Sequence, residues 1–190
     1  MKQLSLYQIR DMATRSGRAV FSIQQLANLI QKPKPISTVY SSRLVKKGLA
    51  KRLLAGKIAF TDDDFVIASQ LVEPAYVTAS SALLFHGLIS QVPRQIQCAT
   101  ASNTRKYPHL GISYHKIPVA LYFGFDRVKR AGSYAFIATP GKALMDSIYL
   151  NLLPPDSIRE LKDQVDGAEL VDYVGRFKGK GKKKLERALL

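Results

Sequence analysis

Apolar side chains recur at helical spacing along the start of the chain. Within residues 4–12, positions 4, 6, 9 and 12 are apolar and fall on one face of a helix, which Gly17 is expected to end. A second helix is predicted to begin at Ser22, because Gln25 three residues later completes a capping box. The residues expected to be buried along this second helix are Ile23, Leu26, Ala27 and Ile30.

A third helix is predicted after a short, stiff turn. Pro33 and Pro35 end the preceding helix, and Ser37 is expected to cap the next one. Gly48 stands where a helix commonly stops. The residues of this helix expected to face the core are Val39, Tyr40, Leu44 and Val45. Tyr40 has a second interpretation, in which its hydroxyl donates a hydrogen bond to a phosphate.

Two short strands are predicted directly after the third helix. They span residues 49–54 and 57–61 and turn at Ala55-Gly56. Three helices followed by a hairpin are typical of a winged helix-turn-helix, so residues 1–61 are predicted to form such a domain.

Residues 62–190 are predicted to form a mixed α/β domain with a small sheet and a helical C-terminal tail. The whole chain is therefore expected to be an α+β protein of two domains, 1–61 and 62–190. Three aspartates, Asp62 to Asp64, mark the boundary and are placed to cap a helix running to about residue 72. The expected strands are Gln95–Thr100, Gly111–Ile117, Tyr122–Val128 and Tyr134–Ala138. The expected helices cover about 80–87 and 141–153, with two or three more in 156–190.

Positive charge is concentrated in the first 61 residues. The chain has a formal net charge of +15, and residues 1–61 hold twelve Lys or Arg against one acid, Asp11. Segregated positive charge on a compact module is expected of a protein that binds the phosphates of a nucleic acid. Charge alone does not separate DNA from RNA, and a winged helix that contacts protein is the alternative.

In a winged helix the third helix enters the major groove of duplex DNA. Arg43 is the best candidate for reading a base, because a guanidinium can bind a guanine edge with two hydrogen bonds. The other residues expected to be exposed on this helix are Ser37, Thr38, Ser41, Ser42, Lys46 and Lys47. The Lys and Arg residues expected chiefly to hold the phosphate backbone are Lys46, Lys47, Lys51, Arg52 and Lys57.

No set of residues predicts an enzyme, a metal site or a cofactor. His86 is expected to be a packed or capping residue, and Cys98, the single cysteine, a buried small hydrophobe. Lys142 and Asp146 lie four residues apart, which predicts a surface ion pair on a helix. The aspartates at 62–64 lack further carboxylates at ligand spacing.

Two further predictions concern the tail and the location of the protein. The Lys/Gly run at 178–184 could be a nucleic-acid-binding tail or a solvated linker, and its glycines favour mobility. The sequence shows no charged-then-apolar leader and no run of about 18 apolar residues, which predicts a cytoplasmic protein with no membrane partner.

The middle of the chain resembles the AbiEi family of type IV antitoxins, which are associated with abortive infection and toxin–antitoxin systems. The resemblance covers most of the chain, because that family also begins with a winged helix. The segments that carry it are Tyr76-Val-Thr, Ser80-Ser-Ala-Leu-Leu-Phe-His-Gly-Leu-Ile, Gln91-Val-Pro, Phe123-Gly and Ala138-Thr-Pro-Gly-Lys-Ala-Leu-Met-Asp-Ser-Ile-Tyr.

The resemblance implies a transcriptional repressor that autoregulates its own operon. Its partners would be a duplex operator, repeated or palindromic if the protein is a homodimer, and a nucleotidyltransferase-like toxin neutralised through residues 62–190. Gly141 departs from the family, which usually has an acid there. This departure puts toxin neutralisation in question and leaves DNA binding untouched, so a stand-alone regulator is an alternative.

Overall fold

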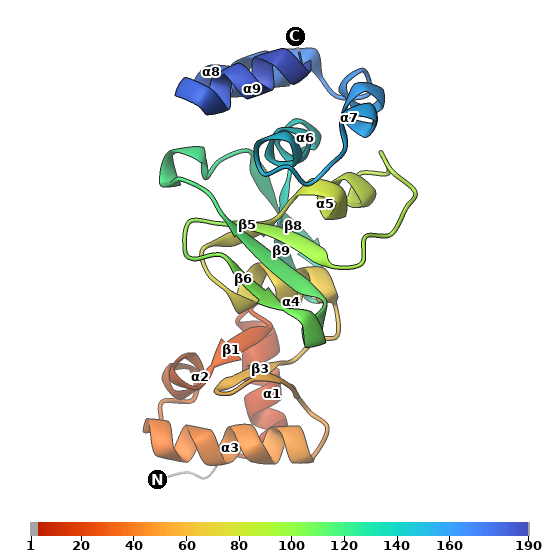
Figure 1. Ribbon diagram of the computed structural model, residues 1–190. Coiled ribbons are helices and arrows are strands. Elements are labelled where there is room, and N and C mark those ends of the chain that lie inside the picture. The colour runs from red at the N-terminus through yellow and green to blue at the C-terminus, as the bar shows by residue number, and fades with distance from the viewer. Residues whose placement is uncertain (1–3, 190) are drawn as a thin grey trace. The chain divides into compact units, whose positions relative to one another are not determined.

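The computed structural model describes residues 4–189, which form an α+β fold (Figure 1). The chain divides into two compact units. Unit 1 comprises Met1–Leu71 together with Val128–Ala135, and unit 2 comprises Val72–Arg127 together with Phe136–Leu190. The boundary predicted between residues 61 and 62 stays a prediction.

Three helices pack together at the start of unit 1, and the second begins at its predicted cap, Ser22, while the first begins two residues later than predicted. They are α1 (Leu6–Arg15), α2 (Ile23–Ile30) and α3 (Lys34–Lys46). Ser5 and Ser22 each accept a hydrogen bond in a complete capping box, with Gln8 and Gln25 as their partners. The residues buried between the helices include Ile9, Leu26, Tyr40 and Leu44.

Helix α3 begins earlier than predicted. Its N-cap is Pro33 rather than Ser37, and Pro35 lies within its first turn, where a missing N–H costs no helical hydrogen bond. The prediction that Ser37 caps this helix is therefore wrong. The Ser37 hydroxyl donates instead to the carbonyl of Pro33, at 3.2 Å.

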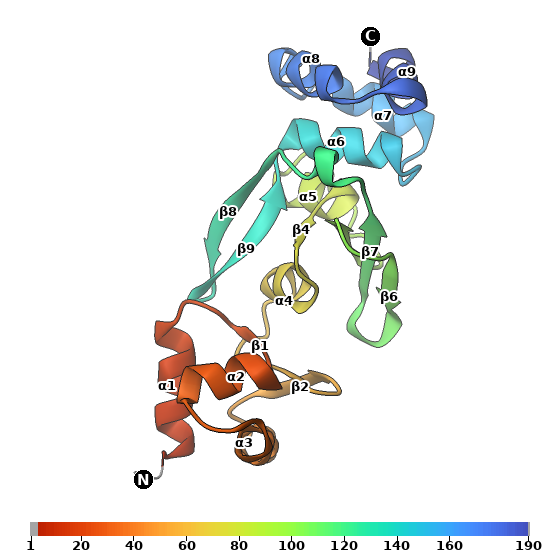
Figure 2. The ribbon, with the colours of Figure 1, turned by 90° about the vertical axis from the view of Figure 1, so that its left-hand side faces the viewer.

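The predicted hairpin is present and belongs to a three-stranded sheet. Strands β2 (Lys51–Leu54) and β3 (Lys57–Ala59) are antiparallel, and β3 also pairs with β1 (Val20–Ser22). The strand order is β1-β3-β2. Figure 2 shows α1, α2 and α3 grouped around this sheet. The short strand β1 was not predicted.

A fourth helix completes unit 1. Asp63 accepts a hydrogen bond from the Val66 amide at 3.0 Å at the start of α4 (Asp64–Leu71), as expected of a capping aspartate. Gln70, on this helix, is 1% exposed. Its side-chain oxygen accepts from the amides of Ala19 and Val20 at 3.0 and 3.1 Å, while its nitrogen donates to Ser133 Oγ at 3.0 Å. One side chain thus joins three segments of unit 1.

A mixed sheet has the strand order β6-β7-β5-β4-β9-β8, and its strands belong to unit 2 except for the part of β8 and β9 within Val128–Ala135. Strand β4 pairs antiparallel with β5 and parallel with β9, while β5 pairs parallel with β7. The strands are β4 (Ala75–Val77), β5 (Ile96–Thr100), β6 (Arg105–Tyr107), β7 (Ile112–Lys116), β8 (Phe125–Arg130) and β9 (Ser133–Ala138). The predicted strands correspond to β5, β7, β8 and β9, while β4 and β6 were not predicted.

Five α-helices accompany this sheet within the described part of the chain. Helix α6 lies between the sheet and the last three helices (Figures 1 and 2). The helices are α5 (Ala79–Phe85), α6 (Pro140–Tyr149), α7 (Pro155–Lys162), α8 (Gly167–Arg176) and α9 (Gly179–Leu189); two 3-10 turns, η1 (Pro108–Leu110) and η2 (Val119–Leu121), also occur.

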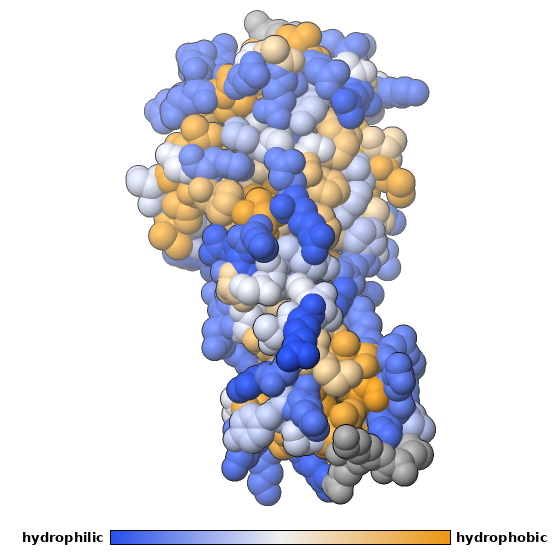
Figure 3. Space-filling model, turned by 180° about the vertical axis from the view of Figure 1, so that it is seen from behind, coloured by the Kyte–Doolittle hydropathy of each residue, from blue (hydrophilic) through white to orange (hydrophobic). Residues whose placement is uncertain are grey.

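The Lys/Gly run at 178–184 is not a linker, because all but its first residue lies in α9, and the nucleic-acid-binding alternative stays a prediction. Leu185 of this helix is fully buried, and the carbon nearest to a Cβ placed on Gly181 is Cε2 of Tyr149, at 3.0 Å. Gly181 therefore allows close packing of α9 against Tyr149. In the view of Figure 3, hydrophilic side chains dominate the surface of these C-terminal helices. No helix within residues 4–189 is long and apolar enough to cross a membrane.

Candidate nucleic-acid interface

One face of α3 presents hydroxyl and cationic side chains side by side. Thr38, Ser42, Arg43 and Lys46 line one open hollow of about 270 Å³, together with Val39. All five recur at helical spacing and are exposed. This face can therefore offer donors to phosphates and to base edges.

The opposite face of α3 is buried, and it differs from the predicted one. Tyr40 and Leu44 lie in the core as predicted. Ser37 and Ser41 were predicted to be exposed, but they are only 0% and 3% exposed. Val39 was predicted to face the core, but it is 49% exposed. Small hydroxyl side chains can be buried at low cost when they bond a carbonyl of their own helix, which Ser37 does.

The β2–β3 hairpin contributes to the same surface of unit 1. Arg52 is exposed, and it lines a narrow hollow of about 60 Å³ together with Thr38 and Ser42. The structure thus brings the predicted helix and hairpin residues together. Lys57 also lines this hollow but is half-buried, and its ammonium donates to the Leu71 carbonyl.

The surface formed by α3 and the hairpin carries mainly positive charge. Asp11 is the only acid in residues 4–61, and its carboxylate is paired with Arg10 at 2.8 Å on α1. Exposed Lys47 follows the last turn of α3. Lys51 lies 3.7 Å from Asp62 in a solvent-exposed pair, which is worth little. Arg43 and Lys46 of α3 are exposed, and neither forms an ion pair with a residue of the described part of the chain.

Two exposed apolar residues of α3 were missed as site candidates. Ile36 and Val39 are 41% and 49% exposed. Apolar side chains on a reading helix can contact the methyl group of thymine. The sequence contained one sign that Val39 belongs to the exposed face. It follows Thr38 directly and precedes Ser42 by three residues, so all three lie on adjoining positions of the helix.

Two histidines and the single cysteine of unit 2 lie in separate surroundings. His86 is exposed and is the C-cap residue of α5, so the capping alternative is confirmed, and its Nε2 atom donates to the Ala138 carbonyl at 2.8 Å. Cys98 is fully buried on β5, and burial raises the pKa of its thiol. Burial, with a smaller contribution from Lys106, lowers the pKa of His115. Among the residues described, no group of three or more His, Cys, Asp and Glu side chains could hold a metal ion.

Lys142 and Asp146 form a buried ion pair, so the prediction of a surface pair is wrong. Their side chains are 0% and 1% exposed, and the ammonium bonds to Oδ1 of the carboxylate. Tyr76 and Thr78 each donate a hydroxyl to Oδ2 at 2.8 Å. Both oxygens of the Asp146 carboxylate therefore accept hydrogen bonds, and a buried ion pair is tolerated when its remaining lone pairs are satisfied in this way.

Aromatic rings surround the Lys142 ammonium in unit 2. Its nitrogen lies 4.9 Å from the centroid of the Phe123 ring and 5.7 Å from those of Tyr76 and Phe177. Burial and the neighbouring Asp146 raise the pKa of Tyr76 above its ordinary value, which keeps its hydroxyl a donor. Lys142 and Asp146 lie on α6 and Tyr76 lies on β4, so these contacts hold α6 against the sheet.

Gly124 is required by this cluster for two reasons. Its φ is +71°, and a Cβ there would lie 3.0 Å from both Lys142 Cβ and Tyr173 Cε2. Gly124→Ala is expected to lower the free energy of unfolding by about 2–3 kcal/mol, from backbone strain and overpacking together. Gly132→Ala is the matched control, because its φ is +73° with nothing within 4 Å, and about 1 kcal/mol is expected. Equal losses in urea unfolding would contradict the packing argument.

No family model matches the sequence, and no curated protein matches it.

Proposed function

We propose that unit 1 is a winged helix-turn-helix that binds duplex DNA and that the protein is a transcriptional repressor. The observation that carries this proposal is the joint placement of Thr38, Ser42, Arg43 and Lys46 on one exposed face of α3, with Arg52 of the hairpin beside it. The uncompensated positive charge of that face favours a polyanion.

The dimensions of α3 fit the major groove. Its 13 residues span about 20 Å at 1.5 Å per residue, and a single helix fits the groove width. Arg43 lies in the middle of the exposed face and is proposed to bind a guanine edge. Val39 is proposed to contact a thymine methyl group, while Lys46, Lys47 and Arg52 hold phosphates.

The resemblance to AbiEi-type antitoxins supports a regulatory context for this reader. In that context the protein would bind the promoter of its own operon, as a homodimer on a repeated or palindromic operator. Unit 2 would then serve the antitoxin role. Gly141 occupies the position where the family usually has an acid. Its amide donates to the Glu169 carboxylate at 3.0 Å. A carboxylate from α8 thus lies beside the position where the family usually has an acid.

A titration of labelled duplex DNA with the full chain tests the proposal. The duplexes would be the DNA upstream of its own gene and a scrambled control, measured by fluorescence anisotropy at several salt concentrations. Affinity is expected to fall about 100-fold or more between about 50 and about 200 mM salt, as for a site with at least four phosphate contacts. No binding at low salt, or binding indifferent to salt, would overturn it. If the protein binds duplex RNA more tightly than duplex DNA, RNA is the partner instead of DNA.

The second candidate is an antitoxin that acts mainly by contact with a nucleotidyltransferase-like toxin. A full-length variant that no longer binds DNA separates the two roles. Adding Arg43→Ala and Arg52→Ala to Lys46→Ala/Lys47→Ala is expected to remove most DNA binding. Rescue of growth by this variant in cells that express a nucleotidyltransferase-like toxin would favour the antitoxin role, whereas rescue only by the unaltered chain would favour repression.

A further inference from the structure

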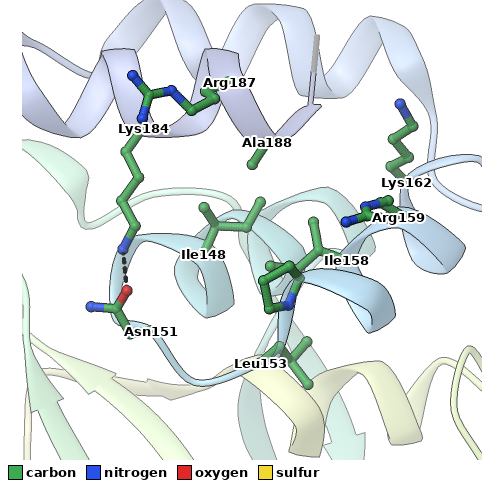
Figure 4. Close-up of a pocket in the computed structure, with 10 residues that line it drawn as sticks. Ile148, Asn151, Leu153, Ile158, Arg159, Lys162, Lys184, Arg187 and Ala188 are labelled. Atoms are coloured by element: carbon green, nitrogen blue, oxygen red, sulfur yellow. Dashed lines mark hydrogen bonds between the residues drawn. The ribbon is translucent and has the colours of Figure 1, made fainter.

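Unit 2 has a hollow of about 650 Å³ between α6, α7 and α9 (Figure 4). Its apolar surface comes from Ile148 at the end of α6, Leu153 in the following loop and Ile158 on α7. Small-molecule sites usually occupy about 300–1,000 Å³ and have a mostly apolar lining, so this hollow has the size of a ligand site.

The hollow is held open by packing on both sides of it. Leu185 and Leu189 of α9 are buried, which fixes this helix against its neighbours. Lys184 reaches across from α9 and donates to Asn151 Oδ1 at 2.6 Å and to the Tyr149 carbonyl at 3.2 Å. The side chain of Lys184 is therefore positioned by the fold rather than left to solvent, and burial lowers its pKa.

Four cationic side chains lie around the apolar residues, and none of the described residues lining the hollow is acidic. Lys184 and Arg187 come from α9, and Arg159 and Lys162 from α7; the pairs flank Ile148 and Ile158 in Figure 4. An acid near this group is Asp156, 3.5 Å from Arg159 in an exposed pair. Four like charges around one hollow repel one another, and a bound anion would relieve that repulsion.

We infer that this hollow binds a small organic anion with an apolar body and one or two acidic groups. The apolar residues contact the carbon skeleton, and Lys162 and Arg187 bind the acidic groups with charge-assisted hydrogen bonds. A nucleic acid fits less well, because its phosphates would lie over the Ile148 and Ile158 side chains without filling the apolar volume. The inference does not depend on the DNA-binding proposal, which concerns residues of unit 1.

Fluorescence titration with anilinonaphthalene sulfonate tests the site on the full chain. This probe combines an apolar ring system with a sulfonate. We expect one saturable site with a blue-shifted emission, and displacement of the probe by octanoate. Arg187→Glu and Lys162→Glu are each expected to raise the Kd by at least about tenfold, as loss of a charge-assisted hydrogen bond together with new repulsion implies.

Two variants keep this test decisive. Lys180→Glu changes the charge of α9 equally at an exposed residue that does not line the hollow, and it should shift the Kd by less than about twofold. Arg187→Gln removes the charge without introducing a negative one, so it serves if Arg187→Glu alters the near-UV circular dichroism. Absence of saturable binding, equal effects of Lys180→Glu and Arg187→Glu, or displacement by a short DNA duplex rather than by octanoate would overturn the inference.

Discussion

Asp146→Ala is expected to lower the free energy of unfolding by about 3–5 kcal/mol, because it leaves the Lys142 ammonium buried without its counter-charge. Lys142 is fully buried, and its ammonium bonds directly to the Asp146 carboxylate. The hydroxyls of Tyr76 and Thr78 lose their acceptor in the same variant. Urea unfolding monitored by circular dichroism measures the loss.

Two controls separate the charge effect from a general effect of the substitution. Lys142→Met/Asp146→Asn removes both charges but keeps an oxygen for the two hydroxyls, so it should cost less than Asp146→Ala alone. Asp172→Ala breaks a pair between exposed side chains, Asp172 at 61% and Arg176 at 50%, and should cost about 1 kcal/mol or less. A double variant less stable than Asp146→Ala would contradict the buried-charge explanation.

Removing two cations of α3 is expected to weaken binding to every DNA duplex. Lys46→Ala/Lys47→Ala should reduce the slope of log K against log salt by about two, because each lysine is proposed to neutralise one phosphate. At moderate salt this corresponds to a loss of affinity of about tenfold or more. Anisotropy titrations at four salt concentrations measure both quantities.

Arg43→Ala should act differently from the lysine variant. It is expected to reduce the preference for the operator over scrambled DNA by about 1–3 kcal/mol, while changing affinity for scrambled DNA much less. Arg105→Ala/Lys116→Ala removes two exposed cations of β6 and β7 and is the charge-matched control. If this control reduces the salt slope as much as Lys46→Ala/Lys47→Ala does, binding is spread over the whole surface and α3 is not the reader.

Local signals predicted much of unit 1. The capping box of Ser22 and Gln25 and the turn at Gly56 depend on residues close in sequence, and the structure confirms both. Hairpin strands β2 and β3 followed from the same local pattern. Strands β1, β4 and β6, by contrast, are three residues long each, and such short segments become strands only through the neighbours that pair with them.

The exposed face of α3 was only partly predictable. A periodicity argument assigns Val39 to the core and Ser41 to solvent, because it ranks side chains by polarity. In the structure Val39 is exposed and Ser41 is buried, and the buried contacts come from Tyr40 and Leu44. Hydroxyls can be buried against helix carbonyls, and exposed apolar residues are common, so polarity alone does not orient a helix in which the two are mixed.

The sequence by itself determined the concentration of positive charge in residues 1–61, the α+β class and most element positions, because these follow from composition and neighbouring residues. Only the tertiary structure decided whether a charge is solvated. Lys142 and Asp146 have the spacing of a surface pair, yet Tyr76, Thr78 and Phe123, distant in sequence, enclose them. The cations around the α7–α9 hollow likewise come from two separate helices. Burial and convergence depend on contacts between distant segments, which sequence spacing does not encode.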